Sequence, residues 1–331
     1  MAAAGKALIA STGGEGIAVL MPCFNTRPDH LHAAVASVAV ERDRLSSLGV
    51  SMQLVVVDDA SPNPATRGAL DEVETLGDWI TVVRQQRNLG SSAARNRALS
   101  MVTQPWIAFL DSDDHWVPGG LTRLYIELRA HPQLDWISGD FHYQYGDASP
   151  ETALFYPHHP QRFRHVEAGY KNNEVVELAM PAVVFLEDTL CSMGSCLIRR
   201  GKLAEVGGFQ TSLSKGDDTE LYWRLARVCR FGFAPWAVFN YRRRVGSQTG
   251  DGGLLSSWEP AVLGRMLNEP YWADYAPQIR ARLLRSLHAA VRYHRHKRDR
   301  LSAARAVLQV LRHDFANIQA WRDLMAILTL G

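Results

Sequence analysis

Cysteine is scarce in this 331-residue chain, which has only Cys23, Cys191, Cys196 and Cys229. Their spacing matches none of the paired patterns that bind zinc. Four thiols in a chain of this length also fall short of the disulfide framework of a small secreted protein. We therefore expect the four cysteines to be reduced and mostly buried.

The chain also lacks a long hydrophobic run and a strong charge of one sign. The apolar stretch near the N-terminus, Ala7–Ala10, is too short for the core of a signal peptide. No run elsewhere approaches the ~18 apolar residues that a membrane-spanning helix needs. With 36 Lys and Arg against 34 Asp and Glu, the net charge of +2 offers no broad basic field for nucleic acid. These absences predict a cytoplasmic protein that does not bind nucleic acid, and they leave attachment to the inner face of the plasma membrane open.

Hydrophobic residues make up 47% of the chain, enough for a sizeable core, and in the first half they form short runs between helical patterns. The apolar runs are Ile17–Met21, Gln53–Val57, Trp79–Val83 and Trp106–Leu110. The helical patterns cover Arg27–Gly49, Ala65–Leu76 and Ser92–Met101. This alternation is typical of a mostly parallel sheet covered by helices on both faces. We predict an α/β fold with a Rossmann-like nucleotide-binding core and a mixed, mainly parallel sheet.

The second half of the chain gives a weaker pattern. Between Ser138 and Met180, aromatic, histidine and proline residues crowd together, and we expect loops with a few strands. Thr219–Val228 predicts a helix and Val238–Arg243 a strand, and the pattern after Ser256 is helical without a strand signal. The predicted organisation is a flexible N-terminus, a nucleotide-binding domain and a helical C-terminal region, at residues 1–15, 16–253 and 254–331.

A cluster with polar side chains follows each of the four predicted strands at its carboxyl end. The clusters are Phe24 and Asn25, Asp58 and Asp59, the Asn88–Gly90 loop, and Asp111–Asp114. In open α/β sheets, ligands bind beyond the carboxyl ends of the strands. The four clusters together therefore define one candidate site.

The acidic turn Asp111–Asp114 is a candidate metal site. Three carboxylates at one strand end repel one another unless a cation or hydrogen-bond donors lie between them. Oxygen-rich sites suit Mg²⁺ or Mn²⁺, which hold phosphates through one or two carboxylates. The alternative is that the acids cap a helix beginning near Pro118. The position of the turn at the end of an apolar strand, beside the other clusters, favours the metal site.

Two further candidates leave alternatives open. Asp58 and Asp59 could accept hydrogen bonds from a base or ribose, or could simply form a turn at the strand end. Arg95 could pair with phosphate or base oxygens, or could lie on a solvated helix face.

The last two candidates stand later in the chain. A carboxylate in Lys215–Glu220 could be a general base, or could cap the helix that follows. The arginines of Tyr241–Arg244 could hold a diphosphate, or could form a basic surface loop.

These motifs, in their order and spacing, resemble the family 2 glycosyltransferases, a large group of inverting enzymes with the GT-A fold. The motifs are PCFN at 22–25, VVVDDASP at 55–62, RNLGSSAARN at 87–96, FLDSDD at 109–114, MGSCLIRR at 193–200, GGF at 207–209, GDDTELYWR at 216–224 and YRRR at 241–244. The resemblance covers about residues 16–250. It implies a GT-A domain that moves a sugar from a nucleoside diphosphate donor, UDP or dTDP favoured, to a hydroxyl group of a glycan or lipid-linked acceptor. Bacterial cell-envelope polysaccharide or lipopolysaccharide synthesis would be its setting.

The resemblance also implies roles for individual residues. Asp218 falls at the general base, and Asp111 and Asp113 form a D-x-D pair that binds Mg²⁺ or Mn²⁺. The residues expected to bind the nucleotide sugar are Pro22, Phe24, Asn25, Asp58, Asp59, Arg95, Asp111, Ser112, Asp113, Arg242 and Arg244.

The sequence departs from the family pattern at two of its motifs. Asp217 stands where the family usually has glutamate. Arg244 stands where many relatives have histidine, and because arginine cannot ligate a metal, Arg244 would neutralise the diphosphate directly. Metal dependence is therefore expected on the strength of Asp111 and Asp113 alone.

Two other functions compete with this interpretation. Nucleotidyl transfer would favour a Gly-rich loop followed by lysine near the first strand, and the sequence has none there. A non-catalytic nucleotide-sugar-binding protein would have no need of a base at Asp218.

The C-terminal region adds a basic helical stretch. Arg280–Arg300 carries eight Lys and Arg residues with leucines between them. Such a helix could lie peripherally on an anionic membrane, which would suit a lipid-linked acceptor. The alternative is a helix that packs on the core and turns a basic face to solvent.

Overall fold

The computed structural model describes residues 15–243 and 255–329. The chain divides into two compact units after Arg243. The predicted domain boundary at 253/254, the predicted flexible N-terminus up to residue 14 and the predicted Gly/Ser-rich segment 246–253 lie outside the described residues.

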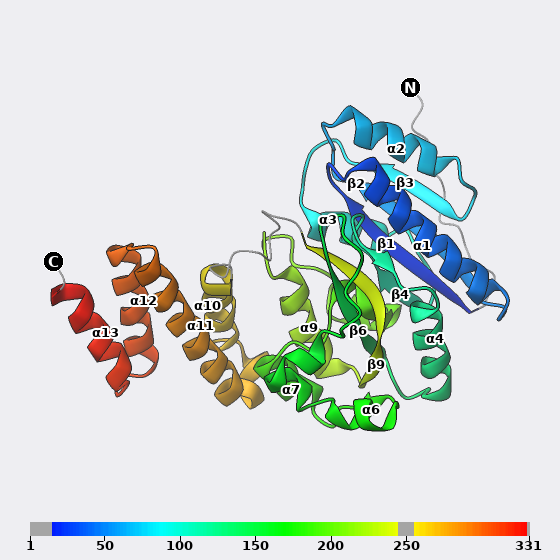
Figure 1. Cartoon of the computed structure of the whole chain (residues 1–331). Coiled ribbons are helices and arrows are strands. Elements are labelled where there is room, and N and C mark those ends of the chain that lie inside the picture. The colour runs from blue at the N-terminus through cyan, green and yellow to red at the C-terminus, as the bar shows by residue number, and fades with distance from the viewer. Residues whose placement is uncertain (1–14, 244–254, 330–331) are drawn as a thin grey trace. The chain divides into compact units, whose positions relative to one another are not determined.

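The first unit is built on one sheet, which has nine strands within the described residues. The strands are β1 (Gly16–Cys23), β2 (Ser51–Asp58), β3 (Ile80–Arg84), β4 (Trp106–Phe109), β5 (His115–Trp116), β6 (Trp136–Tyr145), β7 (Val176–Glu177), β8 (Cys196–Arg199) and β9 (Phe231–Arg243). Their order is β3-β2-β1-β4-β8-β6-β9-β5, with β7 paired to β9. The run β3-β2-β1-β4 is parallel, as is the β6–β9 pair, and the other pairs are antiparallel. This confirms the predicted mixed, mainly parallel α/β sheet (Figure 1).

Helices cover this sheet. They are α1 (Pro28–Ser46), α2 (Pro64–Glu74), α3 (Ser91–Leu99), α4 (Gly120–Ala130), α5 (Pro160–Phe163), α6 (Glu167–Asn172), α7 (Pro181–Glu187), α8 (Arg200–Glu205) and α9 (Asp217–Val228), with short 3₁₀ turns at Tyr156–His158 and Met193–Ser195. Proline begins α1 and α2 because its missing N–H costs nothing at a helix start. The Asn63 side chain caps α2 by accepting from the Ala65 amide at 3.0 Å.

The centre of the sheet is fully buried. Ile17–Met21 of β1 has no exposed surface, because β1 lies between β2 and β4 and is covered on both faces. Such a strand reads as a continuous apolar run, which is why its position could be predicted. All four cysteines are buried with free thiols, as predicted.

The segment 138–180 holds more regular structure than predicted. Its first residues belong to the ten-residue strand β6, and the short helices α5 and α6 follow. β9 begins at Phe231, seven residues before the predicted start, because it pairs with β6 and β7 along its length. Asp140 of β6, fully buried, organises the segment by accepting from the amides of Phe155 (3.1 Å) and Tyr156 (3.2 Å).

The described residues of the second unit form helices joined by short turns, with no strand among them, as predicted. It contains α10 (Leu255–Met266), the 3₁₀ turn Pro270–Tyr275, α11 (Ala276–His296), α12 (Arg300–His313) and α13 (Ile318–Thr329). Two arginines of the basic stretch join its helices: Arg282 pairs with Glu259 and Arg295 with Asp323, each at 2.6 Å. Of the helices in the described parts of the chain, none is both long and apolar enough to cross a bilayer.

Candidate active site

The predicted polar clusters meet at one edge of the sheet. Strand pairing aligns Cys23 with Asp58, and Asp58 with Arg84, at the carboxyl ends of β1, β2 and β3. The residues after β4 emerge at the same edge, because β4 runs parallel to β1 and pairs Phe109 with Leu20. The chain there adopts left-handed backbone at two non-glycine residues, Asn25 (φ 51°) and Ala60 (φ 59°). Strained backbone of this kind gathers at functional sites.

Asp59 holds the loop between β3 and α3. Its carboxylate accepts hydrogen bonds from the amides of Leu89 and Gly90, both at 2.7 Å, and from the Gln85 side chain at 2.8 Å. Gly90 has a φ of 88°, which favours glycine. Asp59 is buried, so these donors replace its hydration. The protein itself thus satisfies both carboxylate oxygens of Asp59.

We expect Asp59→Asn to loosen this loop and to lower the free energy of unfolding by about 1–2 kcal/mol. Asparagine loses the negative charge and keeps only one of the two acceptor oxygens. Hydrogen exchange at the amides of Leu89 and Gly90 should accelerate, and urea titration should report the stability. The exposed carboxylate of Asp78 offers a matched control in Asp78→Asn. Unchanged exchange at both amides would show that Asp59 does not hold the loop.

A second network joins the turns after β1, β2 and β4. The Asn25 amide donates to the Ser61 hydroxyl at 2.9 Å, and the Ser61 amide donates to Asp58 at 3.0 Å. The hydroxyl groups of Thr26 and Ser112 lie 2.6 Å apart. The loops that carry the predicted nucleotide-binding residues are therefore fixed to one another by side-chain hydrogen bonds.

The remaining predicted residues at the start of this edge differ in exposure. Phe24 is about half exposed and offers an aromatic face, whereas Pro22 lies half-buried within β1. An exposed ring beside backbone and amide donors can stack against a base.

Arg95 of α3 connects two acidic groups that lie far apart in the sequence. Its Nη2 donates to Asp111 at 2.6 Å and its Nη1 to Asp217 at 3.2 Å, and Asp217 also accepts from the Ser92 hydroxyl at 2.7 Å. The Arg95 side chain is only 7% exposed, which rules out a solvated helix face. Burial alone would lower the pKa of Arg95, but the carboxylates of Asp111 and Asp217 raise it. Arg95 therefore stays charged between the acidic turn after β4 and the start of α9.

The acidic turn combines exposed and buried carboxylates. Asp111 is 38% exposed, whereas Ser112 and Asp114 are buried. Burial, followed by the charges of Asp113 and Asp111, raises the pKa of Asp114 well above its usual range. A divalent cation would relieve the repulsion among these three carboxylates. Carboxylate oxygens are also the hard ligands that Mg²⁺ and Mn²⁺ prefer. The turn thus fits the predicted metal.

Arg242 of β9 shapes the acidic turn. Its amide donates to Asp114 at 2.7 Å, and its buried guanidinium donates to the carbonyls of Asp113 at 2.9 Å and Gly146 at 3.0 Å. These bonds place Arg242 beside the turn with donors already used on the backbone. Arg244, which was predicted to face the diphosphate, lies outside the described residues.

Asp218 is the second residue of α9, which follows Gly216 and its left-handed turn (φ 71°) into the helix. One carboxylate oxygen of Asp218 accepts from the Thr219 amide at 2.7 Å. Burial, and then the charge of Asp217, raise the pKa of Asp218. A carboxylate with a raised pKa is a better proton acceptor near neutral pH than an ordinary aspartate.

A different cluster has the spacing of metal ligands. Within the described residues, the ligating atoms of Asp29, His30 and Asp147 all lie within 4.8 Å of one another. The guanidinium of Arg27 already spans both carboxylates, with Asp29 at 2.6 Å and Asp147 at 3.0 Å. Because a guanidinium already pairs with both carboxylates of this cluster, the acidic turn suits a metal better.

The sequence did not single out three groups that complete the site. Ser92 and Thr26 are buried hydroxyls that bond Asp217 and Ser112. Asn96 holds Phe209 by accepting from its amide at 2.9 Å and donating to its carbonyl at 2.8 Å. Of the three, only Ser92 could have been predicted from the sequence, because it lies one helical turn before Arg95 and so shares its helix face.

Comparison with known proteins places this geometry in a family. The profile described as "Glycosyl transferase family 2" matches residues 18–207. The chain is 35% identical over 100 residues to TuaG of Bacillus subtilis, a protein named for teichuronic acid biosynthesis. This match covers 30% of this chain and 36% of TuaG. It is 29% identical over 214 residues to the succinoglycan biosynthesis protein ExoW of Rhizobium meliloti, which covers 62% of each. The chain thus spans less than two thirds of the length of these curated relatives.

A solved structure confirms the fold. TarS of S. aureus (residues 1–349), crystallised with UDP-GlcNAc, superposes with a TM-score of 0.62 at 15% identity, over 90% of this chain and 81% of that one. This likeness supports the GT-A fold that the motifs predicted. Since the family profile covers more than half of the chain, the chain belongs to glycosyl transferase family 2.

Proposed function

We propose that this protein is an inverting glycosyltransferase that moves a sugar from a UDP- or dTDP-sugar to a hydroxyl group of a glycan or glycolipid in bacterial cell-envelope polysaccharide synthesis. Family membership and the names of TuaG and ExoW support this assignment. The observation that carries it is Arg95, which bonds both Asp111 and Asp217 and so brings the acidic turn to the start of α9. A donor-binding turn and a proton acceptor then share one site.

In this proposal, Asp218 takes the proton from the acceptor hydroxyl as its oxygen bonds to the anomeric carbon. The bond between that carbon and the diphosphate oxygen breaks on the opposite side, so the configuration inverts. A Mg²⁺ or Mn²⁺ ion bound by Asp111 and Asp113 would neutralise charge on the leaving diphosphate. Arg95 holds Asp111 and Asp217 in place through both guanidinium arms.

The nucleoside would lie over the turns after β1 and β2. Phe24 presents an exposed ring there, and Asn25, Asp58 and Ser112 form the fixed loops around it. Because the carboxylate of Asp59 is filled by backbone donors, we propose that Asp59 acts by holding the Asn88–Gly90 loop. Direct contact of Arg242 and Arg244 with the diphosphate stays a prediction.

The helical unit suits a lipid-linked acceptor. Residues 255–329 contain 12 Lys and Arg against 6 Asp and Glu. We propose that this unit makes peripheral contact with an anionic membrane, to which a basic surface is attracted.

Calorimetric titration with UDP, dTDP and GDP, with and without Mn²⁺ or Mg²⁺, tests the donor site. We expect one nucleotide to bind at least about tenfold more tightly with metal, since the metal bridges the diphosphate and the acidic turn. Asp113→Ala should abolish the metal effect, whereas Asp78→Ala, at an exposed carboxylate, should retain it. If no nucleotide binds under either condition, the transferase assignment is wrong. Binding without turnover of any donor sugar would instead indicate a binding protein.

A further inference from the structure

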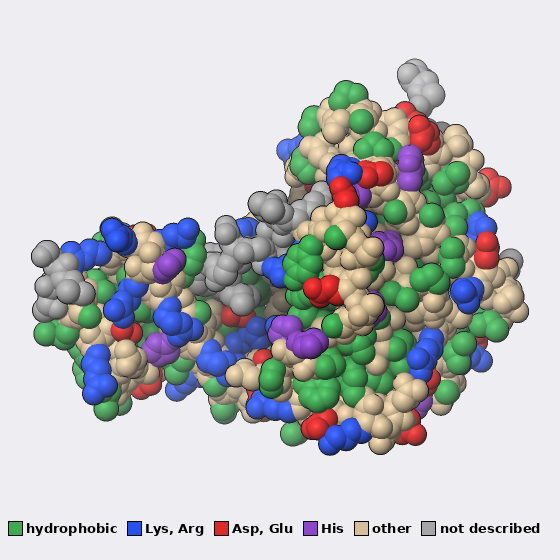
Figure 2. All heavy atoms as spheres, in the orientation of Figure 1, with side chains coloured by type: hydrophobic (Ala, Val, Ile, Leu, Met, Phe, Trp, Pro, Cys, Tyr) green, Lys and Arg blue, Asp and Glu red, His purple; other side chains and the backbone are tan. Residues whose placement is uncertain are grey.

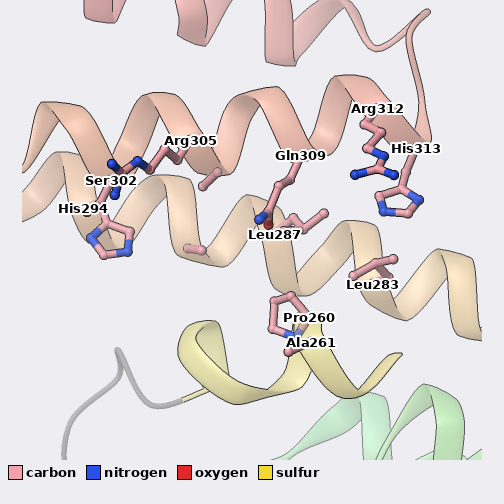
Figure 3. Close-up of a pocket in the computed structure, with 12 residues that line it drawn as sticks. Pro260, Ala261, Leu283, Leu287, His294, Ser302, Arg305, Gln309, Arg312 and His313 are labelled. Carbon is pink, nitrogen blue, oxygen red and sulfur yellow. The ribbon is translucent and has the colours of Figure 1, made fainter. Parts of the chain in front are cut away.

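The helical unit contains a groove between α10, α11 and α12, with a volume of about 420 Å³ (Figure 3). The middle of the groove is apolar. Leu283 and Leu287 of α11 lie between α12 and Pro260 of α10. The small side chains of Ala290 and Ala306 also line the groove. A floor of this kind can accept a hydrocarbon chain.

Cationic and polar side chains line the groove at both ends. Arg312 and His313 lie at one end of α12, and Arg305 lies near His294 at the other. Seven residues of α-helix separate Arg305 from Arg312, or about 10 Å along the axis. No acidic side chain is among the groove-lining residues in the described chain. The groove therefore offers positive charge beside an apolar floor, which is the complement of an anionic amphiphile.

The outer face of α12 continues the same chemistry. Leu301 and Leu308 are more than half exposed. Each lies four residues before an arginine, Arg305 or Arg312, so the leucines and arginines share one helix face. Leucine and arginine alternating along one exposed face are typical of a helix that lies in a membrane interface. Figure 2 shows Lys and Arg side chains distributed over the helical unit with hydrophobic ones between them.

α13 and the turn before it present further exposed aromatic and aliphatic groups. Phe315 is 74% exposed and Ile318 is 69% exposed, and Trp321 and Met325 follow at helical spacing. The Trp321 indole donates to the Phe315 carbonyl at 2.9 Å, and the two rings meet edge to face at 5.3 Å. Tryptophan with an apolar body and a polar edge is favoured at the boundary between lipid and water.

We propose that α12 and α13 bind an anionic phospholipid leaflet, with headgroup phosphates at Arg305 and Arg312, an acyl chain on the floor of the groove, and Phe315, Ile318 and Trp321 inserted among the lipids. A second copy of the chain would be a poor occupant, because the arginines of two such faces would repel each other. This inference rests on the membrane contact proposed above but not on the transfer reaction, because all of these side chains belong to the helical unit.

Sedimentation of the full chain with vesicles tests this proposal. We expect binding to phosphatidylcholine vesicles containing phosphatidylglycerol at least tenfold stronger than to pure phosphatidylcholine, and weakening with added salt. Arg305→Glu with Arg312→Glu should lower partitioning at least tenfold. The control, Arg265→Glu with Arg97→Glu, makes the same change in net charge at exposed sites outside the groove. Circular dichroism and thermal melting show that each variant is folded.

A second variant separates insertion from charge attraction. Ile318→Ser with Trp321→Ser should reduce binding while leaving its salt dependence. Equal binding to neutral and anionic vesicles would overturn the proposal, as would equal loss in the Arg305/Arg312 variant and its control. Capture by polyprenyl phosphate in vesicles free of phosphatidylglycerol, with no binding to phosphatidylglycerol itself, would assign the groove to the acceptor and overturn the leaflet. Self-association abolished by the serine variant would assign the surface to a second copy.

Discussion

Asp218→Asn is expected to lower kcat by about 10²–10⁴-fold, the usual contribution of a general base. Asparagine keeps the size of the side chain and an oxygen that can accept from the Thr219 amide. Nucleotide affinity should therefore change little. Release of nucleoside diphosphate from the donor measures kcat, and calorimetry measures affinity.

Stability provides the control for this variant. Burial, and then the charge of Asp217, raise the pKa of Asp218 in the folded protein. When folding raises the pKa of an acid, the free energy of unfolding of the protein falls as pH rises from the unfolded pKa to the folded pKa. The ionised form of Asp218 therefore destabilises the folded protein at neutral pH. Asparagine removes this destabilisation, and the melting temperature should not fall. Lost turnover would then reflect chemistry, whereas retained turnover would contradict the assignment of Asp218.

The pH profile gives a second readout. Because the base must be ionised, kcat/KM should rise as pH increases through the pKa of Asp218, which burial raises from the ordinary value of aspartate. Asp217→Asn removes a charge that raises this pKa, so the rise should move to lower pH. A shift in the opposite direction would mean that Asp218 is not the group that titrates.

The sequence predicted the sheet edge because its signals are local. β1, β2 and β4 are short apolar runs that each end in a turn with polar residues, and parallel pairing then brings the turns together. The resemblance to family motifs added the expected role of each turn. Parallel pairing of β2 and β4 with β1 puts Asp58 and Asp111–Asp114 at the same end of the sheet.

The parts that escaped prediction depend on distant partners. β6 gave a weak pattern because its neighbours are β8 and β9, which lie some 50 to 100 residues later in the chain. From the sequence alone, Arg95 could either contact a ligand or lie on a solvated helix face. Its partner Asp217 is 122 residues away, so the sequence around Arg95 could not show that it is buried. Likewise, the donors that fill Asp59 lie 30 residues on, in a loop whose path is set by β3.

Arg95 is the position where we expect one substitution to damage both stability and transfer. Arg95→Met removes the only guanidinium bonded to both Asp111 and Asp217 among the described residues, and leaves these two carboxylates beside Asp218. Breaking a buried charge pair is strongly destabilising, and we expect a loss of about 2–4 kcal/mol because Asp111 is partly exposed. Denaturant unfolding measures this loss.

Arg95→Lys separates charge from geometry. Lysine keeps the charge, but a single ammonium cannot reproduce the two arms that reach Asp111 and Asp217, so we expect the stability to recover in part and kcat to stay low. The Arg95 charge also lowers the pKa of Asp218, so Arg95→Met should move the rise of kcat/KM to higher pH. Adding Asp217→Asn to Arg95→Met should restore part of the stability, because one uncompensated charge is then removed. If the lysine variant matches the wild type in both stability and kcat, the two-armed bridge is not what joins the acidic turn to the start of α9.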